Sequence, residues 1–136
     1  MTALLVFVAG GTGVLTRYGI STLFHGPALN WATVGINVAG SFLLGMLLVL
    51  SGDWLTDQTR TALGVGFLGG FTTFSTFSAQ TWVDIEGGEP VRALIYVAVS
   101  VVSGLGCAGL GVRAAAFLAG AYLVAGALAA GVFFAT

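Results

Sequence analysis

The chain has 136 residues, of which 57% are hydrophobic and only 7% are charged. Soluble domains carry about 25% charged residues, so the composition excludes an ordinary soluble protein and predicts an integral membrane protein embedded in a lipid bilayer. The sequence contains four arginines, no lysine and a net charge of -1, and it therefore lacks the clustered basic face that binding to nucleic acid requires.

Apolar stretches of the length needed to cross a bilayer, about 20 residues, follow one another along the chain. We expect membrane-spanning helices at residues 3–24, 31–51, 62–83 and 91–112. Turn-forming and polar residues separate them: His25-Gly26-Pro27 after the first stretch, Ser51-Gly52-Asp53 after the second, and Asp84–Pro90 after the third. Pro90 is placed to begin the fourth helix. The pattern predicts an all-α subunit with four spans.

A further apolar stretch covers residues 114–135, and only Arg113 and nearby glycines mark its boundary with the fourth span. One helix through both stretches would be about 65 Å long, roughly twice the thickness of the hydrocarbon layer. We therefore expect a tight hairpin near residues 111–115. On this interpretation residues 1–113 form the main membrane domain, and residues 114–136 form an additional C-terminal segment with a fifth helix.

The third stretch contains an unusual run from Gly66 to Ser78, which combines glycines, hydroxyl side chains and phenylalanines. Irregular backbone at membrane depth is tolerated only where protein buries it or where it lines a polar path. The run therefore predicts a broken third helix that serves permeation or ion binding. Main-chain carbonyls freed near Gly69-Gly70 and Thr72-Thr73 could coordinate a small cation; alternatively, neighbouring hydroxyls satisfy a simple kink.

Phe74 and Phe77 fall on one helical face, with Thr76 and Gln80 alongside. The edge of an aromatic ring is electropositive, so phenylalanines that present their edges can solvate an anion weakly. Weak binding suits conduction, because an ion must leave a pore as readily as it enters. The alternative is that both rings only pack against lipid or the protein core.

Polar residues in the other spans are candidates for the same path. Asn37 must be paired, since an unpaired amide in hydrocarbon is costly; it either lines an anion path or forms an interhelical hydrogen bond. Arg17 either attracts anions into a vestibule or extends to the membrane interface. Tyr96 and Ser100, four residues apart, either extend a polar track or pack within the bundle.

Enzymatic chemistry finds no support in the sequence. It has one histidine and no acidic residue inside a predicted span, which removes a catalytic triad, a multi-histidine metal site and paired carboxylates. The missing carboxylate also argues against a proton-coupled exporter. With four spans, two arginines face each side of the membrane, so the positive-inside rule gives no preferred orientation. Both orientations are then open to the chain, which allows an antiparallel homodimer; the alternative is that four arginines are too few for the rule to decide.

Three segments resemble the Fluc fluoride channels, also called the CrcB family, over about residues 3–112: Gly10 to Tyr18, Asn37 to Phe42, and Gly66 to Ser78. The resemblance implies a four-span subunit that forms an antiparallel, dual-topology dimer with two fluoride pores in the bacterial inner membrane. It also implies that Gly69 and Thr72 match residues whose main-chain carbonyls, from both subunits, hold a structural sodium ion. The predicted ion pathway comprises Arg17, Asn37, Phe74, Ser75, Thr76, Phe77, Tyr96 and Ser100.

Two features depart from that family. Residues 114–135 add an apolar segment, and Gly104 stands one turn after Ser100, where a second hydroxyl is expected. The function implied by the resemblance is passive export of cytoplasmic fluoride. Two alternatives stay open: a small dual-topology multidrug exporter, and a subunit that pairs with a paralogue in a heterodimeric channel.

Overall fold

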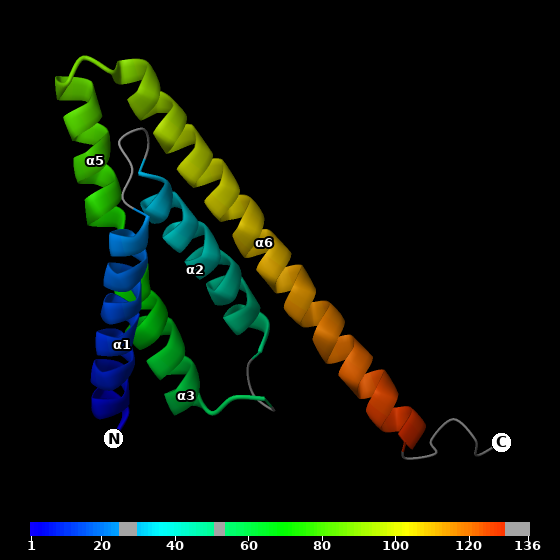
Figure 1. The fold of residues 1–136 in the computed structure, drawn as a ribbon. Helices are drawn as coiled ribbons and strands as arrows, with labels where there is room; N and C mark the ends of the chain where they lie inside the picture. Colours follow the sequence, from blue (N-terminus) through cyan, green and yellow to red (C-terminus); the bar gives the residue numbers. More distant parts are fainter. Residues whose placement is uncertain (25–29, 51–53, 130–136) are drawn as a thin grey trace.

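The computed structural model describes residues 1–24, 30–50 and 54–129, and every regular element among them is a helix (Figure 1). The expected breaks at His25-Gly26-Pro27 and Ser51-Gly52-Asp53 lie outside these residues. The all-α prediction is confirmed. The elements are α1 (Thr2–Leu23), α2 (Trp31–Val49), α3 (Asp57–Thr61), η1 (Ala62–Leu68), α4 (Gly69–Phe71), α5 (Phe74–Glu86) and α6 (Pro90–Ala129).

Three of these helices, α1, α2 and α6, are long and apolar enough to cross a membrane. The first two begin and end within two residues of the predicted spans. Hydroxyl side chains on α1 do not interrupt it, because Thr12, Thr16 and Thr22 donate to carbonyls three or four residues earlier in the same helix. Such local bonds satisfy a hydroxyl where lipid offers no partner.

The third stretch is divided between several short elements. A nearly continuous helix runs from α3 through η1 to α4, and the chain is then extended at Thr72 and Thr73 before α5 begins. η1 is a π-helix, in which the amide of Gly69 donates to the carbonyl of Gly64, five residues earlier. Glycines at 64 and 66 lower the steric barriers to this wider winding. A break within residues 69–73 was predicted; the π-helix was not.

The hairpin predicted near residues 111–115 is wrong, because α6 continues through this region as one helix of 40 residues. Gly111 does not end the helix; its missing side chain lets α2 approach, and a Cβ there would collide with the carbonyl oxygen of Phe42. Arg113 is exposed on the surface of α6, and a long arginine side chain can extend along a helix toward the membrane interface. Alanines at 114–116 favour helix continuation. At about 60 Å, α6 extends well beyond α2 (Figure 1).

Glycines at two interfaces hold the helices close together. α1 packs on η1 and α4, where a Cβ on Gly13 would collide with the carbonyl of Phe67 and one on Gly70 would lie 2.5 Å from the carbonyl of Gly10. α2 packs along α6, where a Cβ on Gly45 would collide with Ala108. The buried core lies between these layers and is formed by Ile36, Leu47, Leu68 and Phe71.

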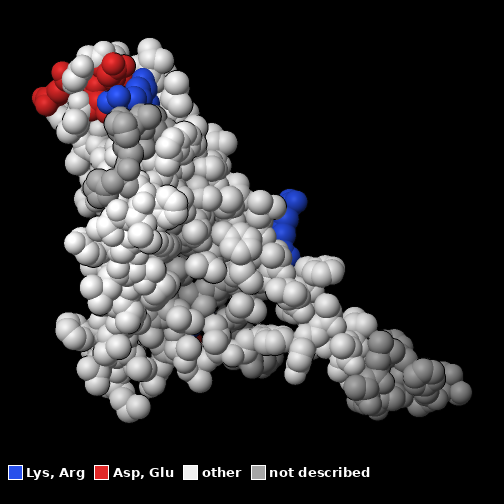
Figure 2. All heavy atoms as spheres, viewed as in Figure 1, with Lys and Arg blue, Asp and Glu red and all other residues white. Residues whose placement is uncertain are grey.

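A tight turn joins α5 to α6, and four of the chain's nine charged residues lie at or beside it: Asp84, Glu86, Glu89 and Arg92. Gly88 adopts φ of 79°, a conformation that glycine enters without steric cost. Asp84 is buried, and its carboxylate accepts a hydrogen bond from Arg92 across the turn and forms an ion pair with it. Figure 2 shows acidic and basic atoms gathered at this end of the molecule, with a largely uncharged surface below.

Candidate functional site

The break after α4 is stabilised by local hydrogen bonds. Thr73 has extended dihedral angles (φ -151°, ψ 113°), and its hydroxyl oxygen accepts from the amide of Thr76 at 3.3 Å, which caps the start of α5. On the other side, the hydroxyl and the amide of Thr72 both donate to the carbonyl of Leu68, at 2.9 and 3.0 Å. The hydroxyls therefore end one helix and begin the next.

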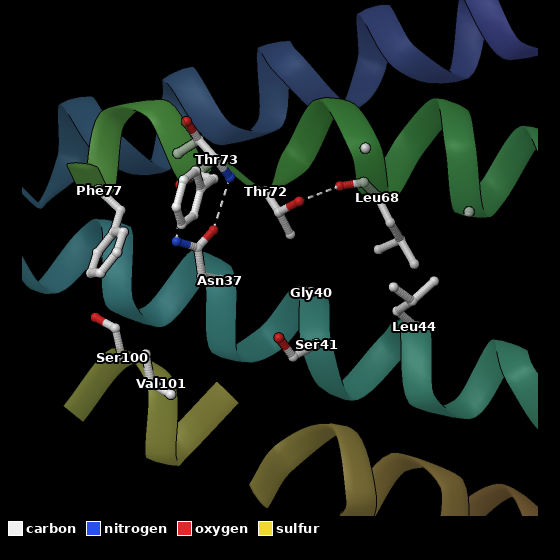
Figure 3. A pocket seen from close by; sticks show the side chains of 13 residues that line it. Asn37, Gly40, Ser41, Leu44, Leu68, Thr72, Thr73, Phe77, Ser100 and Val101 are labelled. Atoms are coloured by element: carbon white, nitrogen blue, oxygen red, sulfur yellow. Dashed lines mark hydrogen bonds between the residues drawn. The ribbon is translucent and has the colours of Figure 1, made fainter. Parts of the chain in front are cut away.

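Two side chains from other helices bind the main chain of the break. Asn37 on α2 uses both atoms of its amide: Oδ1 accepts from the N–H of Thr73 at 2.9 Å, and Nδ2 donates to the carbonyl of Thr73 at 3.2 Å. Figure 3 shows Asn37 extending from α2 toward Thr73. Arg17 on α1 donates through Nε to the carbonyl of Gly70 at 3.1 Å. The interhelical hydrogen bond foreseen for Asn37 is thus present.

A cavity of about 370 Å³ opens beside the break; we call it the break cavity. Six of the predicted site residues line it: Asn37, Gly69, Thr72, Phe74, Phe77 and Ser100. Sequence reasoning had not assigned the remaining lining residues to the site: Gly40, Ser41, Leu44, Gly64, Leu68, Thr73 and Val101. Gly40 and Ser41 lay within the Asn37–Phe42 segment, and Leu68 and Thr73 within the Gly66–Ser78 run, whereas Leu44, Gly64 and Val101 carry no distinctive signal.

Aromatic rings form one wall of this region. The ring centroids of Phe74 and Phe77 are 5.8 Å apart with the planes tilted by 45°, and those of Phe77 and Tyr96 are 5.2 Å apart with a tilt of 48°. Tyr96 is fully buried, and its hydroxyl donates to Oε1 of Gln80 at 2.7 Å. Behind Phe77, the hydroxyl oxygen of Ser100 is buried and has no hydrogen-bond partner among the described residues. Such a group is costly unless something binds it.

A second cavity, of about 360 Å³, lies on the side of Arg17; we call it the Arg17 cavity. Arg17 and Thr76 line it together with Gln80, so two further predicted residues belong here rather than to the break cavity. Tyr96 connects with this side through its bond to Gln80. Ser75 is exposed and lines neither cavity. The hydroxyls of Thr73 and Thr76, 2.9 Å apart, join the linings of the two cavities.

Comparisons with known proteins agree with these motifs. The chain is 43% identical over 106 residues to "Fluoride-specific ion channel FluC" of Thermus thermophilus, an alignment that covers 75% of this chain and 85% of that protein. It is 42% identical over 107 residues to "Fluoride-specific ion channel FluC 2" of Bacillus subtilis, covering 74% and 76%. The family described as "CrcB-like protein, Camphor Resistance (CrcB)" matches residues 4–112. The chain is therefore a multi-pass membrane protein that belongs to the CrcB family.

Proposed function

We propose that this chain is the subunit of a passive, fluoride-selective channel that exports cytoplasmic fluoride across the bacterial cell membrane and so confers resistance to fluoride. The names of its relatives support this function. The observation that carries it is the lining of the break cavity. This lining brings together the rings of Phe74 and Phe77, the amide of Asn37, and the hydroxyl of Ser100, which has no hydrogen-bond partner among the described residues. No charged side chain is among the described residues that line it.

This lining suits a small anion that must keep moving. Ring edges and hydroxyl groups offer partial positive charge, whereas a full positive charge would bind the anion too tightly for rapid release. Ser100 adds a donor that the described part of the protein leaves unused. The pathway in this proposal comprises Asn37, Phe74, Phe77 and Ser100 in the break cavity, Arg17 and Thr76 in the Arg17 cavity, and Tyr96 and Ser75 beside them.

The working form in this proposal is an antiparallel homodimer. Phe74 lines the break cavity, yet 79% of its surface is exposed in the single subunit. A large aromatic residue beside a polar cavity needs a further wall if ions are to be separated from lipid. A second copy of the chain would supply it, and the balanced arginines favour insertion in both orientations.

A structural sodium ion fits the main chain of the break. The N–H of Thr73, which would bond the carbonyl of Gly69 in an unbroken helix, donates to Asn37 instead. The carbonyl of Gly69 is thereby released, and that of Thr72 follows within the extended segment. Sodium is a hard cation that prefers oxygen ligands, as calcium does. Bound between two subunits, it would supply a fixed positive charge close to both anion paths.

The two alternatives are less well supported. A proton-coupled exporter needs an acidic relay within the membrane, but the one buried acidic residue in the described chain, Asp84, is paired with Arg92 at the α5–α6 turn. A partner subunit in a heterodimer remains worth testing, because the name "FluC 2" in Bacillus subtilis indicates a second such protein there. The presence of Asn37, Phe74 and Phe77 together in the break cavity favours a subunit with its own pore.

Reconstitution of the purified chain alone into liposomes separates these functions. Efflux of fluoride from loaded vesicles, without efflux of chloride and without a proton gradient, is the expected result. Uptake of an organic cation driven by a proton gradient would identify an exporter instead. Folded protein that moves neither ion would identify a partner subunit and would overturn the proposed homodimeric channel.

A further inference from the structure

We infer that Asn37 is a positioning residue for the cation site: it makes the carbonyl of Gly69 available by taking the amide that would otherwise bond it. This inference rests on the sodium site of the proposed function, and it assigns to Asn37 a role separate from lining the anion path. The juxtaposition that carries it is the pair of hydrogen bonds between the side chain of Asn37 and the main chain of Thr73.

The hydrogen-bond pattern of a helix explains why one side chain has this effect. In an α-helix each N–H donates to the carbonyl four residues earlier, so the partner of Thr73 N–H would be the carbonyl of Gly69. The amide of Thr72 keeps its helical partner, Leu68, at 3.0 Å. The next amide, that of Thr73, lies 2.9 Å from Oδ1 of Asn37 instead. The helical pattern ends at the residue that Asn37 binds.

Neighbouring carbonyls at the end of α4 are already in use. That of Leu68 accepts from both the amide and the hydroxyl of Thr72, and that of Gly70 accepts from Arg17. The carbonyl of Gly69 lies between these two along the chain, at a residue that is exposed in the single subunit and lines the break cavity. Asn37 and Arg17 together thus leave the carbonyl of Gly69, with that of Thr72, to present to a cation.

Removal of the Asn37 amide should therefore weaken sodium binding directly, apart from any effect on the anion path. With an apolar side chain at position 37, Thr73 N–H has lost its partner, and an unpaired amide at membrane depth is costly. The local remedy is to extend the helix and bond the carbonyl of Gly69. That bond would occupy an oxygen that the cation needs, so the affinity for sodium should fall.

A sodium titration of thermal stability tests this inference on the full-length, detergent-purified protein. Ionic strength is held constant by exchanging sodium for N-methyl-D-glucamine, and the dimer is followed by size-exclusion chromatography. Ligands that bind only the folded state raise the melting temperature with their concentration. For the wild type we expect a rise that begins near the dissociation constant and then grows with the logarithm of the sodium concentration. For Asn37→Leu and Asn37→Ala we expect the sodium concentration that gives the same rise to increase by about tenfold or more, as for a lost hydrogen bond to a buried group.

Two further variants show whether the effect comes from this geometry. Asn37→Asp keeps an oxygen that accepts from Thr73 N–H and adds negative charge near the cation, so it should keep the sodium response while fluoride efflux falls. Thr81→Val removes a hydroxyl whose one bond within the described part of the chain is to the carbonyl of Phe77 in its own helix, and it should keep the wild-type response. The Asn37→Asp arm applies even where the apolar variants do not fold.

The outcomes separate this inference from the proposed function. An unchanged sodium titration in folded Asn37→Leu or Asn37→Ala, or a sodium response lost in folded Asn37→Asp, would overturn the positioning role. A wild-type protein without any sodium response would also overturn it, even if fluoride efflux were normal. Conversely, a wild type that binds sodium as expected but conducts no fluoride would refute the channel and leave the role of Asn37 supported.

Discussion

Nε of Arg17 lies 3.1 Å from the carbonyl oxygen of Gly70, 53 residues away in the sequence, and donates a hydrogen bond to it. The contact joins α1 to the last turn before the break. Carbonyls at the C-terminal end of a helix carry partial negative charge and have no partner within the helix. The guanidinium of Arg17 satisfies one of these carbonyls through Nε, and the same side chain lines the Arg17 cavity.

Arg17 should therefore tolerate replacement poorly even by another cation. Lysine keeps the charge but lacks the planar guanidinium group, whose several donors allow it to bond the carbonyl of Gly70 and line the cavity at the same time. We expect Arg17→Lys to retain part of the fluoride efflux and to lower the free energy of unfolding by about 1–2 kcal/mol, and Arg17→Gln to reduce efflux further. The measurements are efflux from liposomes and chemical unfolding in detergent. Equal efflux in both variants and the wild type would show that the charge does not assist anions.

Close packing between α2 and α6 should depend on Gly111. A Cβ at this position would collide with the carbonyl of Phe42, whereas a Cβ on Gly109 would meet nothing within 4 Å. We expect Gly111→Ala to destabilise the protein by about 1–3 kcal/mol and Gly109→Ala, the matched control, to leave it as stable or slightly more stable. Thermal unfolding of both variants measures the difference. Identical melting temperatures would mean that α6 does not approach α2 at Gly111.

The ion pair at the α5–α6 turn should show coupling between its two members. Asp84 is buried, and its side chain retains 10% exposure against 38% for Arg92. Arg92→Gln leaves this carboxylate without its cation and should lower the free energy of unfolding, by an amount that the partial exposure of the pair reduces. The double variant Asp84→Asn/Arg92→Gln should recover part of the loss. Strict additivity in the double-mutant cycle would argue that the two groups do not interact.

The first two spans, the break in the third stretch and the start of α6 could be predicted from local sequence patterns. The first two spans are continuous apolar stretches, and α1 and α2 begin and end within two residues of the predicted bounds. The break was foreseeable because glycines and hydroxyls replace aliphatic residues in the middle of a span. Pro90 begins α6 as predicted, since proline lacks only an N–H that the first turn of a helix does not use.

Other features depend on contacts that a single sequence does not reveal. A turn was predicted at Arg113 because a charge is costly in lipid. The helix nevertheless continues through it, and Gly111 packs against α2. Asn37 was correctly judged to need a partner. That its partner is the main chain of Thr73 required the relative placement of α2 and the segment between α4 and α5.

Dual topology can be tested with a single accessible cysteine in the α5–α6 turn. Cys107 is the chain's own cysteine and is partly buried in α6, so it is first replaced by serine. In Glu89→Cys on that background, a membrane-impermeant thiol reagent should label about half of the protein in intact cells and all of it after lysis, as expected for equal insertion in both orientations. Complete labelling, or none, before lysis would rule out the antiparallel homodimer.

The most direct test of the proposed path is fluoride efflux through Phe77→Ile. This change keeps the apolar bulk that contacts Tyr96 but removes the electropositive ring edge from the break cavity. An increase of about 1.4 kcal/mol in the free-energy barrier to permeation lowers the rate about tenfold. We predict that fluoride efflux from liposomes falls by at least this factor. Phe117→Ile, at an exposed residue of α6 remote from the cavity, should conduct normally. Wild-type efflux from correctly folded, dimeric Phe77→Ile would contradict the assignment of the break cavity as the fluoride path.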